Sequence, residues 1–196
     1  MALIFNMTHK IDEFTYRANP NEWLEVSDEL NNSIELLTTQ SKMIFMKSDT
    51  WDGVPTKKLM NSRSIFLLMG FVIENLIKGL LVFDNPEYVN KGSFSPELKS
   101  HNLKDLCYKI KDVDLDIEEE MFLNTLSSAI PDWGRYPIPL RFQLIKDEVQ
   151  YSKDINESYI NIRKLFRNKL INRLKGGWKS GLSNKKTNVQ ISFINL

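Results

Sequence analysis

The sequence predicts an all-α protein, organised as a single-domain helical bundle of about five helices. Apolar residues recur at three- to four-residue intervals through several long stretches, which is the period of one buried helix face. Short alternating runs of the kind that form strands are almost absent. With 196 residues and 42% apolar residues, the chain is long enough for one sizeable core.

The first predicted helix begins near Asn19, because Pro20 then takes the first-turn position that proline favours. Its expected buried face consists of Trp23, Val26, Leu30, Ile34, Leu37 and Ile44. The helix should end before "SDTWDGVP", whose Asp, Gly and Pro residues are typical of a loop.

A second long helix is expected from about Pro55 to Phe83, antiparallel to the first. It is apolar over most of its circumference and has the length of a membrane span. However, Glu74, Asn75 and Lys78 interrupt the apolar run, and charges are costly in lipid. The stretch therefore indicates a buried core helix, and no membrane is expected as a partner.

Three shorter helices should follow. One starts at Ser100 or Asn102 and ends near Ile110, a second covers "IEEEMFLNTLSSAI", and the last spans about 155–174. The last helix carries an apolar stripe of Tyr159, Ile162, Phe166 and Leu170. The organisation is an N-terminal segment (1–18), a helical domain (19–175) and a basic polar tail (176–196), in which "VQISFINL" is either a short strand or a docking segment.

Cysteine content and charge bear on location and partners. The single cysteine, Cys107, allows no internal disulfide and lies in an apolar context, which favours a packed thiol in a reducing compartment. No signal peptide is evident, so a cytoplasmic protein is expected. Residues 158–196 contain nine Lys or Arg and no acidic residue, whereas the preceding part has 17 basic and 25 acidic residues. The basic end should meet either that acidic part or phosphate.

A charged stripe runs along the second helix. Arg63, Gly70, Glu74 and Lys78 fall on one side at 100° per residue, and Glu74 and Lys78 form an i,i+4 pair. In an otherwise apolar helix this pair must be buried at least in part. It is either a structural ion pair or part of a ligand site.

Two further segments carry polar chemistry. His101 stands where a helix begins, in "SHNLKDL", and is either a hydrogen-bonding cap or a proton-transfer group. In "DWGRYPIP" (132–139), Trp133 can anchor the loop, Gly134 can permit a turn, and two prolines, Pro137 and Pro139, hold it extended. Arg135, next to Tyr136, would then point from a stiff frame toward Glu74 or toward an external anion.

Metal and cofactor motifs are missing from the sequence. The two histidines, His9 and His101, have no clustered cysteines beside them, so no metal site is expected. Gly-rich phosphate loops and a GxSxG nucleophile motif are absent too. No cofactor is therefore expected.

The three motifs "FVIENLIKGLL", "SHNLKDL" and "WGRYP", in this order, resemble one branch of the HEPN superfamily (higher eukaryotes and prokaryotes nucleotide-binding) over about residues 55–145. Its members carry a Glu–x–Leu–x–Lys pattern in a central helix and a following His–x–Leu–x–x–Leu. The resemblance implies a small all-α bundle, frequent homodimers, and RNA cleavage in toxin–antitoxin and phage-defence systems, with an antitoxin-type protein as a further partner.

The chain departs from the nuclease branch of that superfamily, whose hallmark is an Arg followed four to six residues later by a His. No Arg stands in that range before His9 or His101. A metal-independent ribonuclease would therefore need a composite site, in which His101 exchanges the proton of the 2′-hydroxyl and Arg135 stabilises the phosphorane charge.

Three functional hypotheses follow. The first is an RNA-associated protein without necessary catalysis, and the second is an RNA-cleaving effector that uses the composite site. The third is a non-catalytic homodimeric interaction module in which Arg63, Glu74, Asn75, Lys78, His101, Arg135 and Tyr136 are purely structural. For the first, Arg135 and the basic end would bind phosphate, and Trp178 would stack on a base. The basic residues concerned are Lys164, Arg167, Arg173, Lys175 and Lys179.

Overall fold

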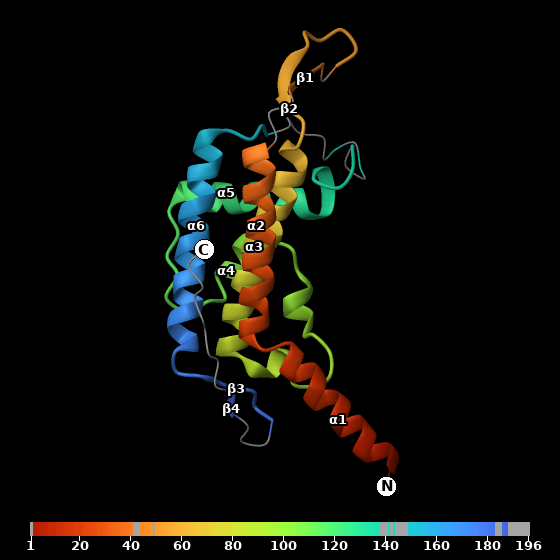
Figure 1. The fold of residues 1–196 in the computed structure, drawn as a ribbon, viewed down its shortest axis with the longest axis vertical. Helices are drawn as coiled ribbons and strands as arrows, with labels where there is room; N and C mark the ends of the chain where they lie inside the picture. The colour runs from red at the N-terminus through yellow and green to blue at the C-terminus, as the bar shows by residue number, and fades with distance from the viewer. Residues whose placement is uncertain are drawn as a thin grey trace.

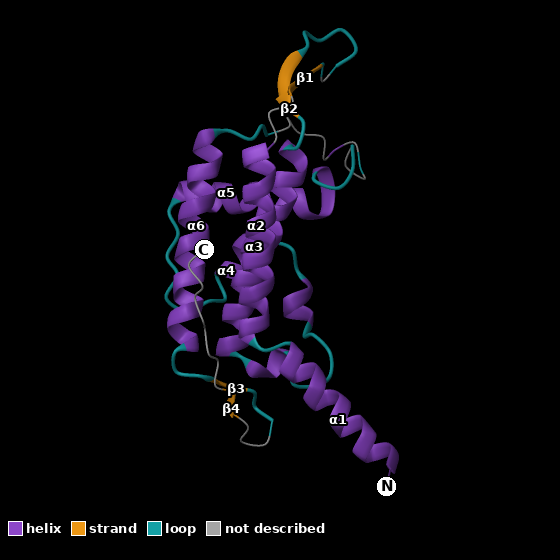
Figure 2. Ribbon diagram, viewed as in Figure 1, coloured by secondary structure: helices purple, strands orange, loops and turns teal. Residues whose placement is uncertain are grey.

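The computed structural model describes residues 2–40, 44–48, 50–137, 141, 143, 149–182 and 186–187. The described chain is 65% helix and 6% strand, with six α-helices (Figures 1 and 2). The predicted predominance of helix is confirmed. Pro139 and the segment "VQISFINL" (189–196) lie outside the described residues.

Helix α2 spans Pro20–Gln40 and begins at the predicted proline. Oδ1 of Asn19 accepts a hydrogen bond from the backbone N–H of Asn21, 2.9 Å away, which satisfies one of the free donors of the first turn. The expected buried face is only partly right. Ile34 is buried, but Val26 is 42% exposed, and the fully covered side of the helix includes Leu24, Ser27, Asn31 and Ile34.

A hairpin follows α2, where the sequence predicted continued helix. Strands β1 (Ile44–Lys47) and β2 (Thr56–Leu59) pair antiparallel, with Ile44 opposite Leu59. Ile44 is therefore not part of the core; it is 62% exposed. The hairpin extends beyond the ends of the helices at one end of the molecule (Figure 1).

Helix α3 spans Ser62–Asp84, so it starts seven residues after the predicted Pro55. It runs beside α2 in the opposite direction, as expected (Figure 1), and α6 also packs against it. By length and composition it could cross a membrane, but 78% of its most apolar window is buried inside the fold, as in a core helix. Gly70 permits close packing here, since a Cβ there would lie 2.8 Å from Cγ1 of Ile130.

Helix α6 spans Lys153–Leu174 and covers one side of α3. Its predicted stripe is buried: Tyr159, Ile162, Phe166 and Leu170 are each at most 3% exposed. The buried hydroxyl of Tyr159 donates a hydrogen bond to Oδ1 of Asn31 on α2, at 2.8 Å. This bond satisfies two polar groups inside the core.

The segments between α3 and α6 form short helices. They are η1 (Pro86–Tyr88), η2 (Pro96–Lys99), α4 (Leu103–Cys107), α5 (Ile117–Ser128) and a π-helical turn η3 (Ala129–Trp133). The helix expected to reach Ile110 thus ends at Cys107. Asp116 and Glu119 form a reciprocal capping box at the start of α5.

Both chain ends have structure that the sequence did not predict. The N-terminal segment forms helix α1 (Ala2–Arg17), which extends away from the other helices (Figure 1). In the C-terminal part, β3 (Trp178–Lys179) pairs with β4 (Lys186–Thr187). Trp178 is only 2% exposed, and its indole N–H donates to the carbonyl of Val82 at the end of α3. The proposed polar tail therefore contributes a large side chain to the core.

Candidate functional site

The most polar part of the protein interior is centred on Glu74 in α3. This carboxylate is 7% exposed and uses both of its oxygens. Oε1 accepts a hydrogen bond from Nζ of Lys78 at 2.6 Å, and Oε2 lies 2.8 Å from Nδ1 of His101. The structure thus brings together three of the residues singled out from the sequence. We refer to them as the Glu74 cluster.

The Glu74–Lys78 pair is one helical turn apart and almost fully covered, with side-chain exposures of 10% and 7%. Removing two charges from water costs several kcal/mol per ion, and only close pairing with further hydrogen bonds offsets that cost. The second oxygen of Glu74 receives its hydrogen bond from His101. The cluster is therefore internally satisfied at its buried end.

His101 belongs to the segment between η2 and α4 and has a side chain that is 44% exposed. An ionised carboxylate only accepts hydrogen bonds, so the proton of the contact resides on Nδ1 of His101. In the neutral ring, Nε2 is then an acceptor. A carboxylate that orients an imidazole in this way is the arrangement used for general acid–base chemistry.

The backbone around His101 is fixed by α4 and α5. Oδ1 of Asn102 caps α4 by accepting from the N–H of Asp105, at 3.2 Å. The N–H of Leu103 donates to Oγ of Ser127 on α5, at 2.9 Å, and the Leu103 side chain is fully buried. These contacts hold the imidazole against α3.

The loop after α5 is anchored by Trp133, as expected. The reason for glycine at position 134 differs from the expected one. The Trp133 ring packs edge-on against Phe66 at 5.0 Å, and its N–H donates to Oγ of Ser128. Gly134 has ordinary helical angles, so no special turn conformation is needed. A Cβ at that position would instead lie 2.5 Å from the carbonyl oxygen of Ala129. Glycine is required by space.

Arg63 connects α3 to this loop. Its Nη1 donates to the carbonyl of Tyr136 at 3.0 Å, and its Nη2 lies 3.4 Å from the carbonyl of Pro137. Tyr136 contributes its backbone to this contact, while its side chain is 45% exposed. Arg63 therefore positions the loop rather than joining the Glu74 cluster.

Arg135 does not form the expected clamp with Glu74, and binding of an external anion by Arg135 stays a prediction. Its guanidinium carbon lies 5.6 Å from the ring centroid of Phe71 on α3, in a cation–π contact, and the residue is exposed. The two oxygens of Glu74 are already taken by Lys78 and His101. The clamp between Arg135 and Glu74 is thus replaced by a contact with an aromatic face, which leaves the guanidinium N–H groups available to an anion.

Phe71 and Glu74 place Arg135 and His101 relative to each other. The two helix positions are three residues apart, which corresponds to about 4.5 Å along the axis and about 60° around it. Arg135 and His101 are therefore held by neighbouring positions on one side of α3. Asn75, one residue further, is turned away from the Glu74 cluster: its amide donates to the carbonyl of Phe71, and it lines a separate pocket.

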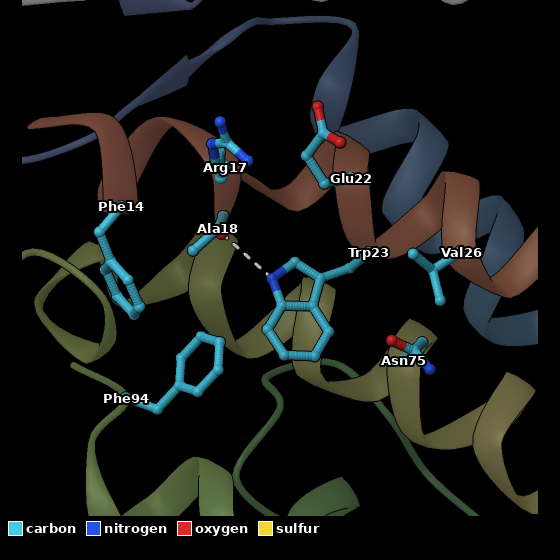
Figure 3. Close-up of a pocket in the computed structure, with 8 residues that line it drawn as sticks. All are labelled: Phe14, Arg17, Ala18, Glu22, Trp23, Val26, Asn75 and Phe94. Carbon is cyan, nitrogen blue, oxygen red and sulfur yellow. Dashed lines mark hydrogen bonds between the residues drawn. The ribbon is translucent and has the colours of Figure 1, made fainter. Parts of the chain in front are cut away.

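That pocket is apolar and has a volume of about 250 Å³ (Figure 3). Its walls come from the end of α1, the start of α2, Asn75 on α3 and Phe94. The rings of Phe14 and Trp23 lie 5.3 Å and 5.6 Å from the ring of Phe94, and the Trp23 N–H donates to the carbonyl of Ala18. No sequence pattern predicted this pocket, because its three rings come from segments distant in sequence.

The proposed nucleic-acid-binding residues at the C-terminal end fall into two groups, of which the first pairs with acidic residues of the chain. Asp28 on α2 binds the guanidinium of Arg167 through both oxygens, at 2.7–3.2 Å, and this contact raises the pKa of Arg167. Arg173 lies 3.1 Å from Asp84, a carboxyl whose pKa is raised by burial although Arg173 opposes the rise. These two arginines meet acidic groups of the chain itself.

The other residues of that group comprise three exposed lysines and one buried tryptophan. Lys164 and Lys179 are exposed, and Lys175 is exposed with its Nζ 2.8 Å from Oδ1 of Asn172. Trp178 cannot stack on a base as proposed, because its ring is buried against α3. Among the described residues, no three His, Cys, Asp or Glu side chains form a group that could hold a metal ion.

Comparison with known proteins adds no assignment. A scan against protein-family models, a search of curated proteins and a search of solved structures each gave no match.

Proposed function

We propose that this chain is an HEPN-like, single-domain helical protein that associates with RNA in the cytoplasm, in a toxin–antitoxin or phage-defence setting. The observation that carries the proposal is the 2.8 Å contact between Oε2 of Glu74 and Nδ1 of a half-exposed His101. This contact supports a proton-transfer role, since it orients a half-exposed imidazole and makes its second nitrogen, Nε2, the acceptor.

The chemistry that this arrangement supports is metal-independent cleavage of RNA. Nε2 of His101 would take the proton of a 2′-hydroxyl as its oxygen attacks the adjacent phosphorus. The P–O5′ bond would break, giving a 2′,3′-cyclic phosphate and a 5′-hydroxyl that takes a proton from water. Arg135 would leave Phe71 or extend from it to balance the negative charge on the phosphorus oxygens.

A second candidate function is a non-catalytic homodimeric interaction module. The observation that favours it is the completeness of the buried hydrogen bonds: Lys78 and His101 satisfy both oxygens of Glu74 without any ligand. The pairing of Arg167 and Arg173 with Asp28 and Asp84 points the same way, because it removes two cations from the proposed phosphate-binding group.

Incubation of the purified protein with structured and single-stranded RNA in EDTA tests the first function. We expect products with 2′,3′-cyclic phosphate ends, and loss of cleavage in His101→Asn, whose amide nitrogen takes the place of Nδ1 and can donate to Glu74 but cannot exchange a proton. His9→Asn is the matched control, because His9 is the other histidine and is exposed on α1. Cleavage that survives in His101→Asn would contradict the catalytic assignment.

If the protein binds RNA without cleaving it, the proposed RNA association stands and the proposed catalysis is rejected. In that case we expect affinity to fall steeply with salt, and Arg135→Ala to weaken binding more than Arg17→Ala, which removes a similarly exposed arginine on α1. If neither binding nor cleavage is detected, the interaction-module function is the one supported.

A further inference from the structure

The hairpin β1–β2 concentrates exposed apolar surface on a projecting part of the molecule (Figure 1). Fifteen large apolar side chains are exposed among the described residues, and seven of them lie in the short stretch from α2 to α3. They are Leu36, Ile44, Phe45, Met46, Trp51, Val54 and Met60. Trp51 is fully exposed. Such a concentration marks an interaction surface rather than ordinary scatter.

The two edges of the hairpin differ in chemistry. Edge strands that avoid pairing carry lysine or proline. Strand β2 follows Pro55 and carries Lys57, which is exposed, and Lys58, which is only 4% exposed. Strand β1 ends in Lys47 but has three apolar residues in a row before it, Ile44–Phe45–Met46, which are 62%, 38% and 60% exposed. The apolar part of β1 therefore has the chemistry of an edge that accepts another strand.

The hairpin also has too few strands to be stable by itself. In the described part of the chain, the sheet consists of β1 and β2 alone. A lone two-stranded hairpin is marginal in water, and three or more strands are needed for independent stability. A further strand on the β1 edge would therefore stabilise the hairpin.

We propose that β1 of a second copy of this chain pairs antiparallel with β1 across a two-fold axis near Phe45, giving a four-stranded sheet. Antiparallel pairing of identical strands is two-fold symmetric, so the contact is closed. With the axis at Phe45, Ile44 lies opposite Met46 of the second copy, and the two Phe45 residues face each other. The pairs formed by Ile44, Phe45 and Met46 are then all apolar, which is favourable across strands, and Lys47 lies outside them at the end of β1.

Charge argues against the other pairings of the hairpin. Pairing of β2 with β2 would bring lysines of both copies together, which is destabilising. Pairing of β1 with β2 of the next copy is not closed and would propagate into a filament. The two-fold β1–β1 contact avoids both consequences.

This inference does not depend on the proposed function. The module hypothesis names a homodimer without an interface, whereas the β1 edge gives the dimer a place and a register. It would stand or fall whether or not RNA is cleaved at His101.

Disulfide cross-linking tests the register. Opposed residues in an antiparallel pair have Cα atoms about 4.5–5.5 Å apart, within the range that a disulfide spans. The native Cys107 is 1% exposed, so an introduced cysteine is the reactive one. We expect Phe45→Cys to form a covalent dimer rapidly under mild oxidation. Lys57→Cys on β2 and Trp51→Cys on the hairpin loop are controls for random collision. Equal rates in all three would overturn the register.

Analytical ultracentrifugation tests the association itself. We expect a concentration-dependent dimer whose dissociation constant rises at least about tenfold in Phe45→Lys, because two ammonium groups would meet at the axis. Lys57→Gln should leave the constant unchanged, and circular dichroism should show both variants folded. A monomer at all concentrations would overturn the proposal. In that case binding to anionic phospholipid vesicles and to RNA is measured for the wild type and for Phe45→Lys. Loss of either binding in Phe45→Lys would show that the hairpin binds that partner instead of a second copy.

Discussion

Nζ of Lys78 lies 2.6 Å from Oε1 of Glu74, and both side chains are at least nine-tenths covered. A buried ion pair of this kind is costly to break, because the partner that remains is an uncompensated charge. We therefore expect Glu74→Leu to lower the free energy of unfolding by about 3–5 kcal/mol.

The double variant Glu74→Leu/Lys78→Met removes both charges and should recover most of that loss, since apolar replacements of buried pairs are often neutral. Urea denaturation of the two variants and of the wild-type protein measures the difference. A single variant as stable as wild type would show that water reaches Lys78.

The contact of Asp28 with Arg163 and Arg167 joins α2 to α6. All three side chains are 23–32% exposed, so the ion pairs are partly screened by solvent. We expect Asp28→Asn to cost about 1–2 kcal/mol of unfolding free energy, with the loss shrinking in high salt. Glu29→Gln on the exposed side of α2 is the control and should change stability little. Denaturation at two salt concentrations decides between an ion-pair contribution and a packing contribution.

Burial of Trp178 leads to a prediction about the C-terminal part of the chain. Trp178→Ala should lower the unfolding free energy by about 3–5 kcal/mol, the usual cost of emptying a buried aromatic site. Trp51→Ala removes the same side chain from a fully exposed position, and it should have almost no effect on monomer stability. If the two variants were equally stable, the C-terminal segment would not be part of the core.

Gly70 should tolerate no larger residue. A Cβ there would lie 2.8 Å from Cγ1 of Ile130, an atom that packing holds in place. Gly70→Ala is therefore expected to cost about 1–3 kcal/mol in unfolding free energy. In Gly176→Ala the new Cβ would have its nearest contact at 3.7 Å, so this variant should be close to neutral. Thermal denaturation of the pair provides the comparison.

The thiol of Cys107 should make stability depend on pH in the alkaline range. Burial, with smaller contributions from Glu119 and Glu120, raises its pKa to about 12 from an ordinary value of 9.0. The folded state therefore holds the thiol proton more tightly than the unfolded state. The resulting stabilisation is complete below pH 9 and is lost as the pH rises toward 12.

Tyr151 and Tyr159, whose pKa values burial also raises, act in the same direction. Comparison of the wild type with Cys107→Ala isolates the contribution of the thiol. The unfolding free energy of Cys107→Ala should fall less steeply above pH 9 than that of the wild type. Native wild-type protein should also react only slowly with iodoacetamide at pH 8. Equal slopes in the two proteins would contradict a buried thiol.

Sequence reasoning succeeded where one local pattern determines the structure. The stripe of Tyr159, Ile162, Phe166 and Leu170 has the helical period and is buried as a unit. His101 and Glu74 were singled out in separate motifs, and the structure places Nδ1 of His101 2.8 Å from Oε2 of Glu74. Whether they perform a function stays a prediction.

Sequence reasoning was less successful where contacts between distant segments determine the structure. The helical period around Ile44 continued past Gln40, but the short strand pair depends on pairing with Thr56–Leu59. Helix α1 was not predicted, although Ile4, Met7, Ile11 and Phe14 recur at helical spacing in its sequence. Glycines and lysines around Trp178 suggested solvent, although the indole itself is buried.

The indole of Trp178 has a practical consequence for shortening the protein. A chain cut after α6 at residue 175 would keep every α-helix, yet it would uncover the end of α3 at Val82, where the indole N–H now binds. Such a truncation would expose an apolar depression at the surface and would promote aggregation. Fusion partners and purification tags are therefore better joined at the α1 end, where the helix already points away from the rest of the molecule.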